Sequence, residues 1–311
     1  MKTCAATPAE IARIVRDVCE TEVRAFKPGN VSLASAGHRM TADDFMRSAE
    51  AIAIPLSLPG LSVGERILFS IRSTRAAVGS NTNLGIVLLL APLAHAALLE
   101  SDETDVSARL SGVLATLSVD DAILAYEAIR IAGPAGLGAS SQHDVKDIPR
   151  ISLLQAMRES QARDRVARQY ATDYRDLFAI GAPAARVALA RWPAREWAAV
   201  AVYLHWLAKF PDTHITRKLG AAVAEQVTAQ AADVERVFKA APSPEHALPA
   251  LRAFDAELKR DGINPGTSAD LTVASLMVMD LQDVFRQRVY DRSVDLAAGY
   301  YPQWASARAF Y

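Results

Sequence analysis

Residues 193–208 read PAREWAAVAVYLHWLA and are apolar on almost every side of a helix. A helix without a polar face has no stable place on a protein surface, so this segment belongs at the centre of a helical bundle. A second apolar run, residues 84–99, is interrupted by Pro92 and His95 and falls short of the ~20 residues that span a bilayer. We therefore predict a second buried core helix there, and no membrane as a partner.

Helix start signals recur along the chain. Capping boxes begin at Thr7, Thr41, Ser62 and Ser118, each with an acidic residue three positions later and apolar residues at helical spacing beyond it. We expect the second of these helices to stop before Pro55. No segment alternates cleanly between apolar and polar residues, so strands are not required. The prediction is an all-α fold, a single compact multi-helix bundle forming one domain over residues 1–311.

Composition narrows the function. Hydrophobic residues make up 51% of the chain, which excludes global disorder, and a net charge of −1 excludes a generally basic nucleic-acid binder. Cys4 and Cys19 are the only cysteines and are expected to be reduced thiols. Charged residues occupy the first twenty positions, where a signal peptide would need an apolar stretch. We expect a cytoplasmic protein that binds no nucleic acid.

Familiar nucleotide and metal motifs are missing. The chain has no GxxxxGK[ST], so a nucleotide is not held by a P-loop, and the glycines of residues 133–138 are in the wrong order for GxGxxG. The six histidines form no HExxH. The dipeptide His143-Asp144 is of the kind found in helical metal-dependent phosphohydrolases, which keeps that enzyme class open as an alternative.

Four polar clusters stand out in the irregular segments between the predicted helices. Glycine lets backbone N–H groups approach an anion, and a following helix N-terminus adds a favourable dipole. The same residue types are also preferred helix caps, and Asp270 in particular fits a capping box begun by Thr267. Separate caps have no reason to meet, whereas parts of one site must, so we predict that the clusters converge on a single cleft. They are residues 27–30 (KPGN), 79–85 (GSNTNLG), 211–218 (PDTHITRK) and 264–270 (NPGTSAD).

In these clusters, in residues 38–40 (HRM), and in Phe45, Ser48 and Ala49, the chain resembles the triphosphoribosyl-dephospho-coenzyme A synthase family. The resemblance runs from about residue 10 to about residue 285. It implies an all-α enzyme that moves the ribose-5-triphosphate part of ATP onto a 2′-hydroxyl of dephospho-coenzyme A and releases adenine. The product is the precursor of a prosthetic group on a lyase or decarboxylase carrier protein.

The chain departs from the citrate-lyase branch of that family at two motifs. Residues 81–85 read NTNLG where that branch has Asn-Thr-His-Lys-Gly, so an imidazole and a cation are absent. Residues 37–40 read GHRM where that branch has the longer His-Lys-Asp-Met. The form seen here resembles a divergent branch found in archaea and in bacteria that use methanopterin-type one-carbon carriers. The resemblance therefore leaves the acceptor open.

Displacement of adenine from the ribose C1 passes through an oxocarbenium-like transition state, as glycoside cleavage does. The reaction needs a clamp for the triphosphate, a base for the attacking hydroxyl and help for the departing adenine. Mg²⁺ is the expected partner of the triphosphate and takes one or two carboxylates. We assign Asp212 and Asp270 to catalysis or metal binding, Asp144 to metal binding, and His38 to protonation of the leaving base.

The remaining candidates bind the nucleotide. Lys27, Arg217 and Lys218 are the phosphate cations, and Asn30, Asn81, Asn83 and Gly266 contact the ribose, the adenine or the phosphates. The expected partners are a nucleotide and a small-molecule acceptor, with homo-oligomerisation left open. A metal-dependent phosphohydrolase and a non-catalytic helical protein of a cofactor-biosynthesis assembly stay as alternatives.

Overall fold

The structure, a computed structural model, describes residues 4–35, 37, 40–134 and 144–299. Within these ranges the chain is helical and has no strand beyond two isolated bridges, which confirms the all-α prediction. A π-helix, η1 (Leu177–Gly181), precedes α9, and a 3₁₀-helix, η2 (Pro244–Ala247), precedes α13. The α-helices are α1 (Pro8–Arg24), α2 (Ala42–Ser57), α3 (Val63–Val78), α4 (Leu84–Leu98), α5 (Val106–Ala115), α6 (Val119–Ala132), α7 (Leu153–Ser160), α8 (Arg165–Ala171), α9 (Ala182–Arg191), α10 (Arg195–Lys209), α11 (Thr213–Leu219), α12 (Ala221–Ala240), α13 (Leu248–Arg260) and α14 (Gly266–Gly299).

The predicted capping boxes begin their helices as expected. At Thr7, Thr41, Ser62 and Ser118 the hydroxyl accepts from the backbone N–H three residues later, and the acidic side chain there accepts from the cap's own N–H. Each box satisfies two of the N–H groups that a helix leaves without an intrahelical partner. The starts of α1, α2, α3 and α6 therefore follow from local sequence alone.

The prediction that the second helix stops before Pro55 is wrong. Helix α2 continues to Ser57, and Pro55 lies inside it. The residue after the proline explains the difference: Leu56 is fully buried, and its carbonyl accepts a hydrogen bond of 2.7 Å from the Arg66 guanidinium of α3. Packing and this tertiary bond outweigh the hydrogen bond that proline removes.

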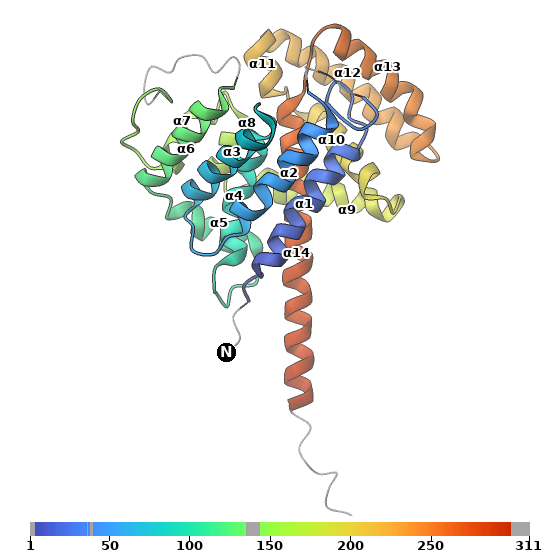
Figure 1. The fold of residues 1–311 in the computed structure, drawn as a ribbon. Helices are drawn as coiled ribbons and strands as arrows, with labels where there is room; N and C mark the ends of the chain where they lie inside the picture. The colour runs from blue at the N-terminus through green and yellow to red at the C-terminus, as the bar shows by residue number, and fades with distance from the viewer. Residues whose placement is uncertain (1–3, 36, 38–39, 135–143, 300–311) are drawn as a thin grey trace, which may run out of the picture.

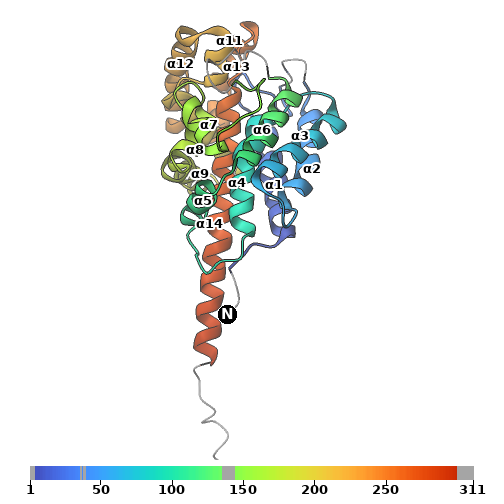
Figure 2. The same cartoon turned by 90° about the vertical axis from the view of Figure 1, so that its left-hand side faces the viewer.

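Helices α4, α10 and α14 form the interior. Every side chain of α4 from Ile86 to Ala94 is buried, and most of α14 from Thr267 to Leu281 is buried as well. No residue of α10 between Arg195 and Ala208 is exposed, as its apolar sequence predicts. Figures 1 and 2 show α14 running the length of the molecule beside α4 and continuing beyond the body.

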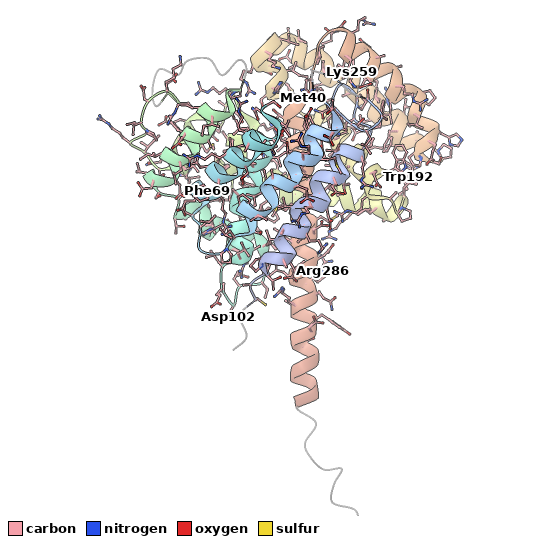
Figure 3. The ribbon with its side chains drawn as sticks, viewed as in Figure 1. Met40, Phe69, Asp102, Trp192, Lys259 and Arg286 are labelled. Atoms are coloured by element: carbon pink, nitrogen blue, oxygen red, sulfur yellow. The ribbon has the colours of Figure 1, made fainter. Side chains whose placement is uncertain are left out.

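The other helices pack around this interior in two groups. Helices α1, α2, α3 and α6 pack in succession on one side, and α9, α10, α12 and α13 lie on the other side of α14 (Figure 1). One continuous hydrophobic core joins both groups. Among the described helices, none combines the length and the hydropathy that a bilayer crossing requires. In Figure 3, Met40 and Lys259 mark one end of the body and Asp102 the opposite end.

Candidate active site

A cavity of about 630 Å³ opens where the helix ends meet near Met40. This volume lies within the range of small-molecule sites. Its walls come from α1, α4, α6, α7, α8, α11 and α14 and from the segments before and after them. The polar side chains on its walls include Glu22, Asn30, Asn81, Asn83, Asp144, Arg163, Asp164, His214, Arg217, Lys218 and Asp270.

The structure brings all four polar clusters to this one cavity, although they lie far apart in the sequence. The predicted site residues that line it are Asn30, Asn81, Asn83, Asp144, Arg217, Lys218, Gly266 and Asp270. Lys27 and Asp212 are buried behind the wall and do not line it. His38 lies outside the described residues, and so does His143 of the phosphohydrolase motif.

Lys27 is placed as a structural residue and not as a phosphate clamp. Its side chain is fully buried, and its ammonium donates to the carbonyl oxygens of Glu22, Ala25 and Val31 at 2.6, 3.2 and 3.1 Å. The same ammonium lies 3.1 Å from the Glu22 carboxylate. With these four partners, Lys27 fixes the loop after α1 and orients Glu22 toward the cavity.

Asp212 joins two helix N-termini. One carboxylate oxygen accepts from the backbone N–H groups of His214 and Ile215 at the start of α11, at 2.9 and 3.2 Å. The other oxygen accepts from the N–H and the hydroxyl of Ser268 in the first turn of α14, at 2.7 and 2.8 Å. Burial raises the pKa of Asp212, and these hydrogen bonds oppose the rise. Both oxygens are committed to the protein, so this carboxylate suits the joining of two helices better than metal binding.

Asp270 lies on the cavity wall without such partners. Helix α14 begins before it, at Gly266, and the Thr267 hydroxyl accepts from the His214 N–H at 3.1 Å, so Asp270 does not complete a capping box. Among the described residues no hydrogen bond or ion pair holds its carboxylate. Burial raises its pKa well above the ordinary value, the negative charges of Glu22, Asp212 and Asp164 add to the rise, and Arg217 opposes it.

Gly85 makes room for the Asp270 carboxylate at the start of α4. A Cβ atom placed on Gly85 would come within 2.0 Å of Asp270 Oδ2. Glycine at this position therefore lets α14 bring a carboxylate against the first turn of α4, where the helix dipole favours negative charge. The NTNLG cluster thus contributes through its glycine as well as its asparagines.

Glu22 is a cavity residue that sequence reasoning missed. It is only 2% exposed and borders the cavity at the C-terminal end of α1. Burial raises its pKa, and Lys27 opposes the rise. A signal was present: Glu22 continues the apolar face formed by Ile11, Val15 and Val18, where an acidic residue is out of place.

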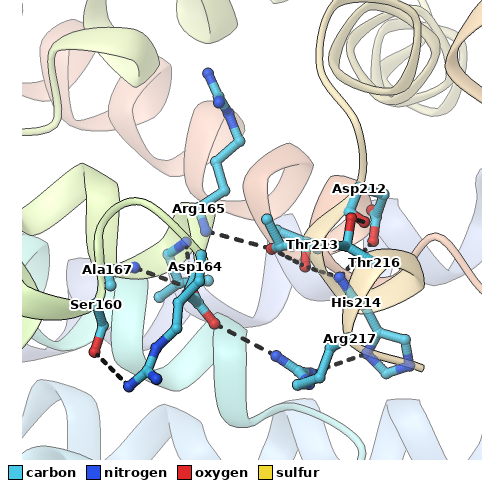
Figure 4. A network of polar contacts seen from close by, with 12 residues as sticks. Ser160, Asp164, Arg165, Ala167, Asp212, Thr213, His214, Thr216 and Arg217 are labelled. Carbon is cyan, nitrogen blue, oxygen red and sulfur yellow. Dashed lines mark hydrogen bonds and ion pairs between the residues drawn. The ribbon is translucent and has the colours of Figure 1, made fainter. Parts of the chain in front are cut away.

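A polar network places the cavity's arginine. Arg217 of α11 lies 3.4 Å from the Asp164 carboxylate and 3.4 Å from His214 Nδ1 (Figure 4). Asp164 also caps α8 by accepting from the N–H groups of Val166 and Ala167. The backbone N–H of Arg165 donates to the Thr213 hydroxyl, which ties the start of α8 to the start of α11. The network therefore fixes the Arg217 guanidinium at the mouth of the cavity.

The walls of the cavity differ in character. Arg163, Arg217 and Lys218 form a cationic edge, and neither Arg163 nor Asp164 was expected from the sequence. The part between α4, α6 and α7 is apolar and includes Leu88, Ile129, Leu153 and Met157, with the hydroxyl of Tyr126 nearby. Such a cavity suits a ligand with an anionic end and a less polar body. No group of three or more His, Cys, Asp or Glu in the described ranges is arranged as a metal site.

Comparison with known proteins agrees with this geometry. A candidate triphosphoribosyl-dephospho-CoA synthase from Archaeoglobus fulgidus, known from a crystal structure, has the same fold, with a TM-score of 0.57 and 23% identity. The match covers 75% of this chain and 96% of that chain. No curated protein matches the chain significantly. The family model for ATP:dephospho-CoA triphosphoribosyl transferase matches residues 8–289. The chain therefore belongs to the ATP:dephospho-CoA triphosphoribosyl transferase family, whose members are transferases that use ATP.

Proposed function

We propose that this chain transfers the triphosphoribosyl group of ATP to a hydroxyl of dephospho-CoA and releases adenine, within the cavity described above. The observation that carries the proposal is the convergence of four distant polar clusters on one cavity in a chain of this family. A single continuous core supports its action as one domain.

The cationic edge is the proposed triphosphate clamp. Arg217 and Lys218 lie on it as expected, and Arg163 takes the third place that the sequence assigned to Lys27. Arginine binds phosphate oxygens through paired N–H groups, and the Asp164 contact holds the Arg217 fork in position. Gly266 brings the start of α14 to the cavity, where helix N–H groups favour an anion.

Asp270 is the proposed general base. In the reaction the bond between ribose C1 and the adenine nitrogen breaks, and a bond between C1 and the acceptor oxygen forms. The proton of the attacking hydroxyl passes to Asp270, whose raised pKa makes it a stronger base than an ordinary carboxylate. Protonation of the departing adenine is proposed for His38. Asn30, Asn81 and Asn83 are placed to contact the ribose and the base.

Mg²⁺ is the proposed companion of the triphosphate. When bound it would offset phosphate charge, a task for which one or two protein carboxylates suffice. Of the ligands predicted from the sequence, Asp270 and Asp144 line the cavity and Asp212 does not. The cavity therefore offers carboxylates that fit a hard cation, while Asp212 holds the helices that carry them.

The acceptor is the part of the proposal that the departures at residues 81–85 affect. Asn83 and Leu84 line the cavity where the citrate-lyase branch has an imidazole and a cation. We propose dephospho-CoA as the acceptor, and a hydroxyl-bearing precursor of a methanopterin-type one-carbon carrier as the second candidate. The apolar wall around Leu84 favours an acceptor with a less anionic contact at this position.

The experiment is an adenine-release assay with ATP and Mg²⁺ in the presence of each acceptor. Adenine is measured by liquid chromatography and the adduct by mass spectrometry. We expect adenine and adduct in equal amounts with one of the acceptors. Release of phosphate without adenine would instead support the phosphohydrolase, and the lack of any nucleotide binding would support a non-catalytic role.

A further inference from the structure

Three oxygen-bearing side chains meet on the wall of the cavity from three helices that pack against one another. Glu22 comes from α1, Asn83 from the residue that begins α4, and Asp270 from the first turns of α14. Helices α1, α4 and α14 are mutually in contact. Glu22 and Asn83 also border the same void of about 10 Å³, so their side chains are neighbours.

The Asn83 amide is incompletely bonded. Its side chain is only 4% exposed, and its Nδ2 donates to the Thr74 hydroxyl at 3.1 Å. Its Oδ1 has no hydrogen-bond partner, although it is buried and its residue lines the cavity. A buried acceptor without a partner costs free energy, and such groups in native proteins call for a bound species.

The two carboxylates add an unbalanced charge at the same place. Lys27 neutralises Glu22 from behind at 3.1 Å, but no ion pair in the described structure neutralises Asp270. Gly85 lets the Asp270 carboxylate sit against α4, where any larger residue would displace it. Two carboxylates and an amide oxygen are the donor types that hard divalent cations prefer.

We propose that Glu22, Asn83 and Asp270 form a binding site for a divalent cation of the Mg²⁺ class. Lys27 is its positioning residue, because the buried ammonium fixes the Glu22 carboxylate as an outer-shell partner does in metal sites. The assignment replaces Asp212 and Asp144 as metal ligands. It deepens the proposed function, on which it rests for the triphosphate that completes the coordination.

Asp144 is the matched control. It lines the same cavity, but it belongs to the segment after α6, and the charges that act on Asp270 are those of Glu22, Asp212, Asp164 and Arg217. The charge of Asp144 acts instead on Tyr126 of α6. An Asp144→Asn variant therefore removes a cavity carboxylate without touching the proposed site.

The test is Mn²⁺ binding measured by electron paramagnetic resonance on the whole chain without nucleotide, with Mg²⁺ as competitor. We expect one Mn²⁺ per chain, displaced by Mg²⁺, and affinity lowered about tenfold or more by Asp270→Asn or Glu22→Gln. Asn83→Ala should also weaken binding, Asn83→Asp should strengthen it, and Asp144→Asn should leave it unchanged. Circular dichroism checks folding, and the double variant Glu22→Gln/Lys27→Met serves if Glu22→Gln alone unfolds.

Absence of Mn²⁺ binding to the unmodified chain would overturn the site. So would an Asp144→Asn variant that loses as much affinity as Asp270→Asn, since that result would return the metal to the set predicted from sequence. Adenine release is measured separately. A chain that transfers the group without binding Mn²⁺ keeps the proposed function and loses this site, and a chain that binds Mn²⁺ without transfer does the reverse.

Discussion

The Asp270 carboxylate carries a cost in stability that its chemistry requires. Burial and the neighbouring carboxylates raise its pKa in the folded chain, so the folded state binds the proton more tightly than the unfolded state does. This contribution to the free energy of unfolding is full below the ordinary pKa of aspartate and is lost as the pH rises through the raised value. A desolvated charge then remains at neutral pH.

Replacement of Asp270 by asparagine should therefore stabilise the metal-free chain. At pH 7 we expect Asp270→Asn to unfold at a higher urea concentration than the unmodified chain, and the difference should vanish near pH 4. Urea titrations followed by circular dichroism at several pH values measure this. A variant that is less stable at pH 7 would show that Asp270 is a structural cap after all.

The Lys27–Glu22 pair makes the opposite prediction. Lys27→Met leaves the Glu22 carboxylate buried without its cation and should cost about 3–5 kcal/mol in the free energy of unfolding. The double variant Glu22→Gln/Lys27→Met should recover part of that cost, because it removes the uncompensated charge. Equal losses in the single and double variants would mean that only the three carbonyl contacts of Lys27 matter.

At this scale the sequence predicts residue types better than residue roles. Asn30, Asn81, Arg217, Lys218 and Asp270 reach the cavity because clusters of polar residues and glycine mark loops between helices. Lys27 and Asp212 belong to the same clusters but are buried. Whether a side chain faces a cavity or a neighbouring helix depends on tertiary packing, which local spacing does not contain.

Among the elements, α4 depends on a long-range bond. Pro92 has no N–H to donate to the Leu88 carbonyl one turn earlier, and the Tyr170 hydroxyl of α8 donates to that carbonyl at 2.6 Å instead. Tyr174 donates to the Leu89 carbonyl at 3.2 Å. These tyrosines allow a proline inside a helix that is buried on every side.

Tyr170→Phe should destabilise the chain by about 1–3 kcal/mol, because a buried carbonyl loses its principal donor. The matched control is Tyr290→Phe, since Tyr290 is 62% exposed and should change the free energy of unfolding very little. Thermal or urea unfolding of both variants measures the difference. Equal stability of the two variants would mean that Tyr174 alone satisfies the freed carbonyl.

Helix starts and helix ends differ in how far local sequence predicts them. The starts of α1, α2, α3 and α6 are written in capping boxes, which are complete within four residues. The end of α2 is not local, because the burial of Leu56 and its bond to Arg66 carry the helix through Pro55. Glu22 was missed for a related reason: its partner and its cavity lie outside its own helix.

For the whole molecule, the all-α class follows from the periodicity, while the cavity follows from how α1, α4, α11 and α14 meet. Convergence of distant clusters is the property that a nucleotide should report. Mg-ATP at 100 times its dissociation constant should stabilise the chain by ~2.7 kcal/mol. Asp102→Asn, at the opposite end of the body (Figure 3), should respond as the unmodified chain does, and Arg217→Met should respond less. The lack of a thermal shift at millimolar Mg-ATP would contradict nucleotide binding.

The central claim is that Asp270 performs chemistry in a transferase cavity, and its most direct test is turnover. Adenine release from Mg-ATP with the acceptor is measured for the unmodified chain and for Asp270→Asn, together with the melting temperature. We predict that the variant melts no lower at pH 7 and turns over about 10²–10⁴-fold more slowly, as expected for loss of a general base. A folded Asp270→Asn variant that releases adenine at the normal rate would contradict the account.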